Sequence, residues 1–226
     1  MKSASERRVA LQHLASDIHD CEQCPRLVEW TRHVAIEKRA AYREETYWGR
    51  PVSGFGDPAA RIVVLGLAPG AHGANRTGRV FTGDRSGEWL YRAMHKAGLA
   101  NQPTSEHRDD GLRLTNAWVT VAVRCAPPAN KPTPEERTRC APFLQRELAL
   151  LARARVIVCL GAFALQAAAE LLAISPRPKF AHGAVIEVGN YVLVCSYHPS
   201  QQNTFTGTLT EPMLDAVFAE AVRLAK

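Results

Sequence analysis

Four short apolar runs constrain the fold of this chain more than any other feature. They cover residues 62–67, 118–123, 156–160 and 192–197, and each is rich in β-branched side chains. Nearly continuous apolar character is expected of strands that are covered on both faces. Helical patterns follow these runs at residues 85–97, 133–152, 161–173 and 211–224. The alternation predicts an α/β protein with three α/β/α layers and a central four-stranded parallel sheet.

Length and composition set the remaining limits. The chain has 226 residues and 46% hydrophobic content, which suits one domain over 1–226 with a sizeable core. Its beginning lacks the apolar core of a secretory signal, and no run approaches the roughly eighteen apolar residues of a membrane span. We therefore expect a monomeric cytosolic protein with no membrane partner. The net charge of +6 favours a polyanionic partner but does not identify one.

The amino-terminal sixty residues are less regular. Ser3-Ala-Ser-Glu6 forms a capping box, so a helix is predicted from there to about Asp20. Residues 31–59 mix charges, aromatic side chains and Pro/Gly turns, and we interpret them as an irregular covering segment.

A glycine-rich loop follows the first strand. Residues 66–84 contain five glycines, a polar tail and the single aromatic residue Phe81. Glycine lets backbone amides approach a ligand closely, and loops at the carboxyl ends of parallel strands are common ligand sites. The alternative is a crossover loop whose glycines serve only turns. We favour a binding site for a phosphate, sugar or base.

A second polar loop follows the fourth strand and reaches the same edge of the sheet. It reads His198-Pro-Ser200-Gln-Gln202-Asn203-Thr. Pro199 favours an extended backbone at His198, and the hydroxyl and amide groups that follow suit phosphate oxygens. The two loops are expected to meet over one crevice.

Four of the six cysteines lie outside the predicted strands. Cys21 and Cys24 form a C-x2-C pair, and Cys125 and Cys140 flank fourteen residues. Four thiolates can bind a zinc ion or an iron-sulfur cluster, and the spacing alone favours the cluster only slightly. Cys159 and Cys195 lie inside predicted strands and are expected to be core residues.

Taken together, these motifs resemble the uracil-DNA glycosylase superfamily, most closely its type 5 branch. The resemblance covers nearly the whole chain. It depends on residues 66–78 with Phe81-Thr-Gly-Asp84, on Arg124-Cys-Ala-Pro-Pro with residues 130–135, and on His198-Pro-Ser. The family implies a [4Fe-4S] cluster on Cys21, Cys24, Cys125 and Cys140, and DNA as the partner.

The resemblance also implies roles for individual residues. An enzyme that acts on a base must draw it out of the DNA helix and stack it in a pocket, for which Phe81 is the candidate ring. Asp84 would serve the sugar side, where positive charge develops, and His198 would donate to a base oxygen. Asp84 also fits as the N-cap of a helix, and Phe81 alone would suit the core. The remaining candidate contacts to base or DNA are Gly66, Ala68, Gly70, His72, Asn130, Ser200, Gln202 and Asn203.

Two departures from the uracil-specific branches affect the expected activity. Those enzymes carry an acidic residue where this chain has Leu67 and Ala68, and a tyrosine at the position of Gly70. The open Gly70 position is expected to admit uracil and also larger deaminated bases such as hypoxanthine. His72 either lines the pocket or faces solvent, and Asn130 ranks below the other site residues. No lysine or proline is clearly placed as an amine nucleophile, so we expect a monofunctional glycosylase that leaves an abasic site.

Two other functions remain open from sequence. One is a non-catalytic iron-sulfur protein that binds damaged DNA. The other is a nucleotide hydrolase, which the absence of a Gly-Lys-Ser/Thr ending disfavours. For a DNA-binding face, Arg76, Arg79, Arg85 and Lys131 are expected to contact phosphates.

Overall fold

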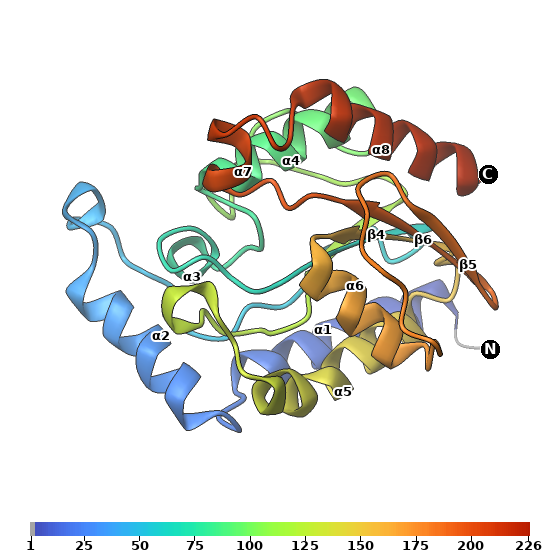
Figure 1. Ribbon diagram of the computed structural model, residues 1–226. Coiled ribbons are helices and arrows are strands. Elements are labelled where there is room, and N and C mark those ends of the chain that lie inside the picture. The colour runs from blue at the N-terminus through green and yellow to red at the C-terminus, as the bar shows by residue number, and fades with distance from the viewer. Residues whose placement is uncertain (1–2) are drawn as a thin grey trace.

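The computed structural model describes residues 3–226 (Figure 1). In that range six strands form one sheet, in the order β1-β3-β2-β4-β6-β5. Its parallel centre confirms the four predicted strands, which are β3 (Ala117–Val121), β2 (Ile62–Gly66), β4 (Val156–Leu160) and β6 (Tyr191–Ser196). Two antiparallel edge strands were not predicted, β1 (Phe55–Gly56) and β5 (Val185–Val188).

Helices cover both faces of the sheet, as the buried strands require. Figure 1 shows α4 (Arg85–Lys96) and α8 (Glu211–Leu224) on one face. The other face carries α1 (Ala4–His19), α5 (Pro134–Leu150) and α6 (Ala162–Leu171). Successive residues of β2 enter different cores: Val64 packs with the α4 and α8 side, whereas Val63 packs with the α5 and α6 side. This alternation explains why the strands are apolar throughout, and the three-layer prediction is confirmed.

Local signals place the ends of the predicted helices. The Ser3 hydroxyl accepts a hydrogen bond from the Glu6 amide, and the Glu6 carboxylate accepts one from the Ser3 amide, so α1 begins with the expected capping box. Thr133 and Glu136 form the same arrangement at the start of α5. These caps satisfy amide groups that lack partners inside the helix.

The interpretation of residues 31–59 as irregular was partly wrong. Helix α2 (Pro25–Glu37) begins directly after Cys24 and buries Leu27, Thr31 and Val34. A 3-10 turn, η1 (Ala40–Tyr42), follows it. Short helices also lie within the polar loops: α3 (Ala74–Thr77), η2 (Pro128–Asn130) and α7 (Gln201–Phe205).

The strand order fixes where a ligand crevice is expected. In chain order β2 is the first parallel strand, yet it lies between β3 and β4. The connections from β2 and β3 therefore run in opposite directions along the sheet, and a crevice is expected at the carboxyl ends of β2 and β4. In Figure 1, α3 and α7 lie at this end, opposite the chain termini.

Candidate active site

Phe81 and His198 meet at the carboxyl edge of the sheet. Their ring centroids are 5.8 Å apart, with an angle of 35° between the ring planes. Gly66, the last residue of β2, allows this placement because a Cβ atom there would lie 2.5 Å from Cζ of Phe81. The two polar loops that the sequence predicted to converge are therefore in contact through these two rings.

His198 is held by the loop that carries it and by the end of β4. The Asn203 side-chain amide donates to the His198 carbonyl at 2.9 Å, and Ser200 caps α7 by accepting from the Asn203 amide. A Cβ atom on Gly161, just after β4, would lie 3.4 Å from the His198 Cβ. Burial lowers the pKa of His198 to about 4. Its imidazole is therefore neutral near pH 7, with one nitrogen able to donate and one able to accept.

Asp84 is the N-cap of α4, so the capping interpretation is confirmed. Its Oδ1 accepts from the Gly87 amide at 3.0 Å. The other oxygen, Oδ2, lies against the glycine-rich loop, where Cβ atoms on Gly70 and Gly73 would come within 2.9 and 1.9 Å of it. Burial raises the pKa of Asp84, although amide hydrogen bonds oppose the shift. A groove of about 810 Å³ opens beside this carboxyl group, between α4 and residues 103–107.

The other predicted site residues are more dispersed. Nδ1 of His72 is 3.0 Å from the Tyr47 hydroxyl, so His72 is held by a protein partner. Ala68 packs near Cys125. Asn130 on η2 and Gln202 on α7 are exposed. Within residues 3–226, the ring contact at the sheet edge is formed by Phe81 and His198 and includes neither of these two side chains.

Two arginines do not take the surface position that sequence suggested. Arg76 is buried, pairs with Glu45 and donates to the carbonyl oxygens of His72 and Gly83. Arg79 is buried against Asp110. The expectation that Arg76 and Arg79 lie on an open DNA-binding face is therefore wrong, because both guanidinium groups are buried and bonded to protein acceptors. Arg85 and Lys131 remain exposed.

Cys21, Cys24, Cys125 and Cys140 line one small cavity beneath α2, although sequence places them in three separate segments. Cys21 and Cys24 come from the α1–α2 turn, Cys125 from the loop after β3, and Cys140 from α5. Within residues 3–226, no group of three or more His, Cys, Asp or Glu side chains is arranged to hold a single metal ion. Cys159 and Cys195 are fully buried, which confirms that they are core residues.

Burial disfavours the charged form of the thiols in this cavity. Burial and repulsion between the neighbouring cysteines raise the pKa of Cys125, and burial raises the pKa of Cys140 to about 11. Thiolates at these positions therefore need positive charge nearby. Arg139 lines the cavity and partly offsets the raised pKa of Cys24 through its charge and a hydrogen bond. Two other arginines are engaged elsewhere: Arg26 pairs with Glu136, and Arg124 pairs with Glu147. The Arg124 backbone amide donates to the Cys140 sulfur at 3.3 Å.

Some residues that build the site were missed by sequence reasoning. Gly161 makes room for His198, and Gly73 makes room for Asp84. The signal for Gly161 was its place directly after the predicted strand 156–160. Tyr47 contacts His72 from a segment that was interpreted as irregular, and nothing in its local sequence marked it.

None of the helices within residues 3–226 has the length and apolar character needed to cross a lipid bilayer.

Comparison with known proteins identifies the family. Residues 53–222 match the uracil DNA glycosylase superfamily. The type-5 uracil-DNA glycosylase of Mycobacterium tuberculosis is 55% identical over 209 residues, covering 91% of this chain and 78% of the relative. The type-5 enzyme of Thermus thermophilus is 54% identical over 208 residues, covering 91% and 94%. A type-4 uracil-DNA glycosylase of Thermotoga maritima is 31% identical over 150 residues, covering 66% and 69%. The chain therefore belongs to the uracil-DNA glycosylase superfamily, in its type-5 branch.

Proposed function

We propose that this protein is a DNA repair glycosylase that hydrolyses the bond between uracil and deoxyribose in DNA. Named type-5 uracil-DNA glycosylases match more than nine-tenths of the chain. The observation that carries the proposal is the contact between Phe81 and His198. It brings an aromatic ring and a neutral imidazole to the carboxyl edge of the sheet, where the strand order predicts a ligand crevice. A flipped base needs a ring on which to stack and a polar group that reads its edge.

On the base side, Phe81 stacks against the flipped base and His198 donates a hydrogen bond to a base oxygen. When the C–N bond breaks, its electron pair passes to the base, and negative charge develops on that oxygen. A donor fixed in advance stabilises this charge more than mobile water does. A neutral imidazole is suited to the task because it needs no proton from solvent, and burial lowers the pKa of His198 to about 4.

On the sugar side, Asp84 stabilises the positive charge that develops on deoxyribose. Oδ1 is fixed by the α4 amides, and Oδ2 faces the glycine-rich loop. A carboxylate in a partly buried site interacts strongly with a nearby cation. Water then adds to the sugar carbon and gives up a proton, for which the Asp84 carboxylate is the candidate base. The products are free base and an abasic site, with the DNA strand intact.

We extend the substrate range to other deaminated bases, including hypoxanthine. Gly70 leaves space that a large side chain would fill. Glycine at position 70 also makes room for Asp84, because any side chain at this position would press on the Asp84 carboxyl group. Substitution of Gly70 therefore tests specificity and catalysis together, and comparison of uracil with hypoxanthine separates the two effects.

We also propose that Cys21, Cys24, Cys125 and Cys140 hold a [4Fe-4S] cluster. Support comes from the cavity that all four cysteines line. Four cysteine thiolates are the usual ligands of such a cluster. When bound, the cluster would tie the α1–α2 turn to α5 and to the loop after β3.

The test of activity uses a labelled duplex with one uracil. After incubation with the protein, mild alkali should break the labelled strand at the uracil position, while the untreated sample stays intact. A duplex with thymine in place of uracil is the control. Binding without any alkali-sensitive product would support the non-catalytic binder instead, and breakage before alkali would contradict the monofunctional assignment.

A further inference from the structure

The backbone at Phe81 adopts a conformation that a non-glycine residue rarely takes. Its φ angle is 53°, in the left-handed region. The Phe81 carbonyl also lies close to α4, because a Cβ atom on Gly87 would fall 2.0 Å from that oxygen. Such a conformation persists only where surrounding contacts impose it. The orientation of the ring therefore depends on whatever holds residues 79–83.

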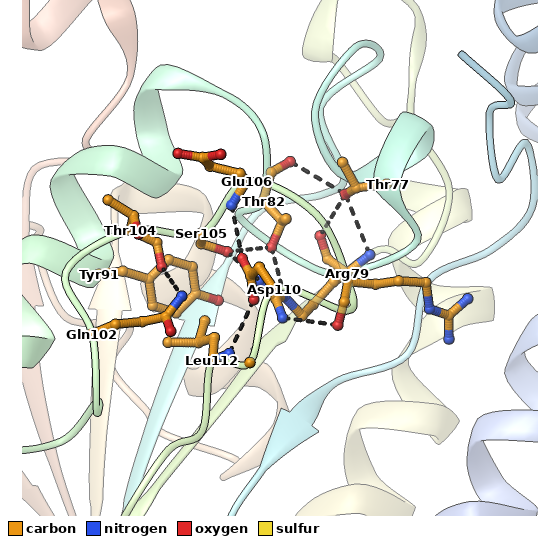
Figure 2. A network of polar contacts seen from close by, with 12 residues as sticks. Thr77, Arg79, Thr82, Tyr91, Gln102, Thr104, Ser105, Glu106, Asp110 and Leu112 are labelled. Atoms are coloured by element: carbon orange, nitrogen blue, oxygen red, sulfur yellow. Dashed lines mark hydrogen bonds and ion pairs between the residues drawn. The ribbon is translucent and has the colours of Figure 1, made fainter.

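Arg79 is the centre of the contacts that hold this turn. Its Nε donates to the Thr82 hydroxyl at 3.0 Å. Nη1 donates to the Arg108 carbonyl at 3.0 Å, and Nη2 donates to Ser105 at 2.8 Å and Asp110 at 2.7 Å. All three guanidinium nitrogens are thus bonded within the protein, to Thr82 in the turn and to residues 105–110 in the facing loop (Figure 2).

Residues 105–112 form the other half of this arrangement. Asp110 accepts from Arg79 and from the backbone amides of Glu106 and Leu112. Burial alone would raise the pKa of Asp110, but these hydrogen bonds outweigh it and hold the pKa at about 2. Ser105 contacts the Thr82 hydroxyl at 2.7 Å, and its carbonyl accepts from the Gly83 amide. Figure 2 shows these side chains converging between the two segments.

We propose that Arg79, Ser105 and Asp110 are positioning residues that hold Phe81 in its left-handed conformation, so that its ring is ready for a flipped base. The inference rests on the proposed function of Phe81. None of the three residues acts on the substrate itself: Arg79 and Asp110 are 7% and 9% exposed at their side chains, and Ser105 is 5% exposed. Their effect passes through the turn that they bind.

The experiment is a double-mutant cycle between Asp110→Asn and Phe81→Ala. Single-turnover release of uracil is measured for wild type, both single variants and the double variant. Asparagine keeps the size of Asp110 but removes the charge opposite Arg79. We expect Asp110→Asn to slow release by about ten- to a hundred-fold, because displacement of an aligned group by about 1 Å costs that order. In the Phe81→Ala background, the same substitution should change the rate by no more than about two-fold. The ring that Asp110 helps to position is then absent, and the effects of substitutions at interacting residues do not add.

Two further variants separate positioning from general loss of stability. Asp17→Asn also removes the carboxylate of an ion pair, of 2.6 Å with Arg146, but this pair joins α1 to α5 on the opposite face of the sheet; it should keep the wild-type rate. Ser105→Ala removes one hydroxyl and replaces Asp110→Asn as the test variant if Asp110→Asn does not fold. It should show the same dependence on Phe81 with a smaller loss. Affinity for a duplex with a tetrahydrofuran site, which contains no base, should stay unchanged in both turn variants.

The outcomes are separable. A wild-type protein that releases no uracil would overturn the proposed function and this inference with it. If wild type is active and Asp110→Asn slows the reaction equally with and without the Phe81 ring, the positioning role is wrong while the function stands. An unchanged rate in the folded Asp110→Asn and Ser105→Ala variants would overturn it as well.

Discussion

Substitution of Gly66 by alanine should slow uracil release strongly, because it acts directly on the Phe81 ring. A Cβ atom at this position would lie 2.5 Å from Cζ, 2.8 Å from Cε2 of Phe81 and 3.3 Å from Cγ1 of Val121. Ordinary carbon contacts are about 3.5 Å or longer, so the ring must move by about 1 Å. Misplacement of this size costs about a hundred-fold in rate, and the crowding costs about 1–3 kcal/mol of stability.

The assay is single-turnover cleavage of a uracil duplex, with thermal unfolding measured in parallel. Gly189→Ala is the matched control. It lies in the turn between β5 and β6 with φ of 54°, and a Cβ atom there would meet nothing within 4 Å. Alanine at a positive φ should cost about 1 kcal/mol of stability without change in rate. The reasoning is refuted if Gly66→Ala cleaves uracil as fast as Gly189→Ala does.

Three more predictions concern pH, the cysteines and the core. Because burial raises the pKa of Asp84, the rate of uracil release should fall as the pH drops through that raised pKa. Asp84→Asn should be slow at every pH and should not show this fall. If the variant loses rate at acid pH in the same way as wild type, the role assigned to Asp84 is wrong. His198, with a pKa of about 4, should cause no loss of rate between pH 6 and 8. Cys140→Ser should lower the iron content and brown colour of anaerobically purified protein, whereas a colourless wild type with stoichiometric zinc would reject the cluster. Glu147→Gln leaves the buried Arg124 without its ion partner and should cost about 3–5 kcal/mol in urea unfolding; a loss below about 1 kcal/mol would show that the pair matters little.

The parallel centre of the sheet was predictable because its strands are buried on both faces. Val63 and Val64 enter separate cores, so every position of such a strand must be apolar, and the run stands out in the sequence. Edge strands lack this signal. In β5, Val185 is exposed and Ile186 is half-buried, and its four residues pair with a single neighbour. Helix α2 was missed because its buried stripe is narrow, with Thr31 at its centre.

The positions of site residues that directly follow strand ends were predictable from the sequence. The partners of buried polar side chains were not. Phe81 and His198 lie in loops that leave neighbouring regions of one sheet edge, so their proximity follows from topology. The burial of Arg79 does not follow from topology. A basic residue beside a glycine-rich loop suggests phosphate binding, but its partner Asp110 lies thirty-one positions away in a loop with no periodic pattern. Sequence spacing cannot show that such a pair is buried, because a buried ion pair requires that both segments fold against each other.

The glycines of the site link these observations, because at several positions they make room for the protein's own side chains. Gly66 admits the Phe81 ring, Gly73 admits the Asp84 carboxyl group, and Gly161 lies beneath His198. Each of the three groups is therefore set against backbone, which cannot change rotamer as a side chain can. A side chain held in this way loses little further freedom when substrate binds, so less binding energy is needed to order it. The same contacts explain why a single methyl group at Gly66 or Gly73 should damage catalysis more than its size suggests.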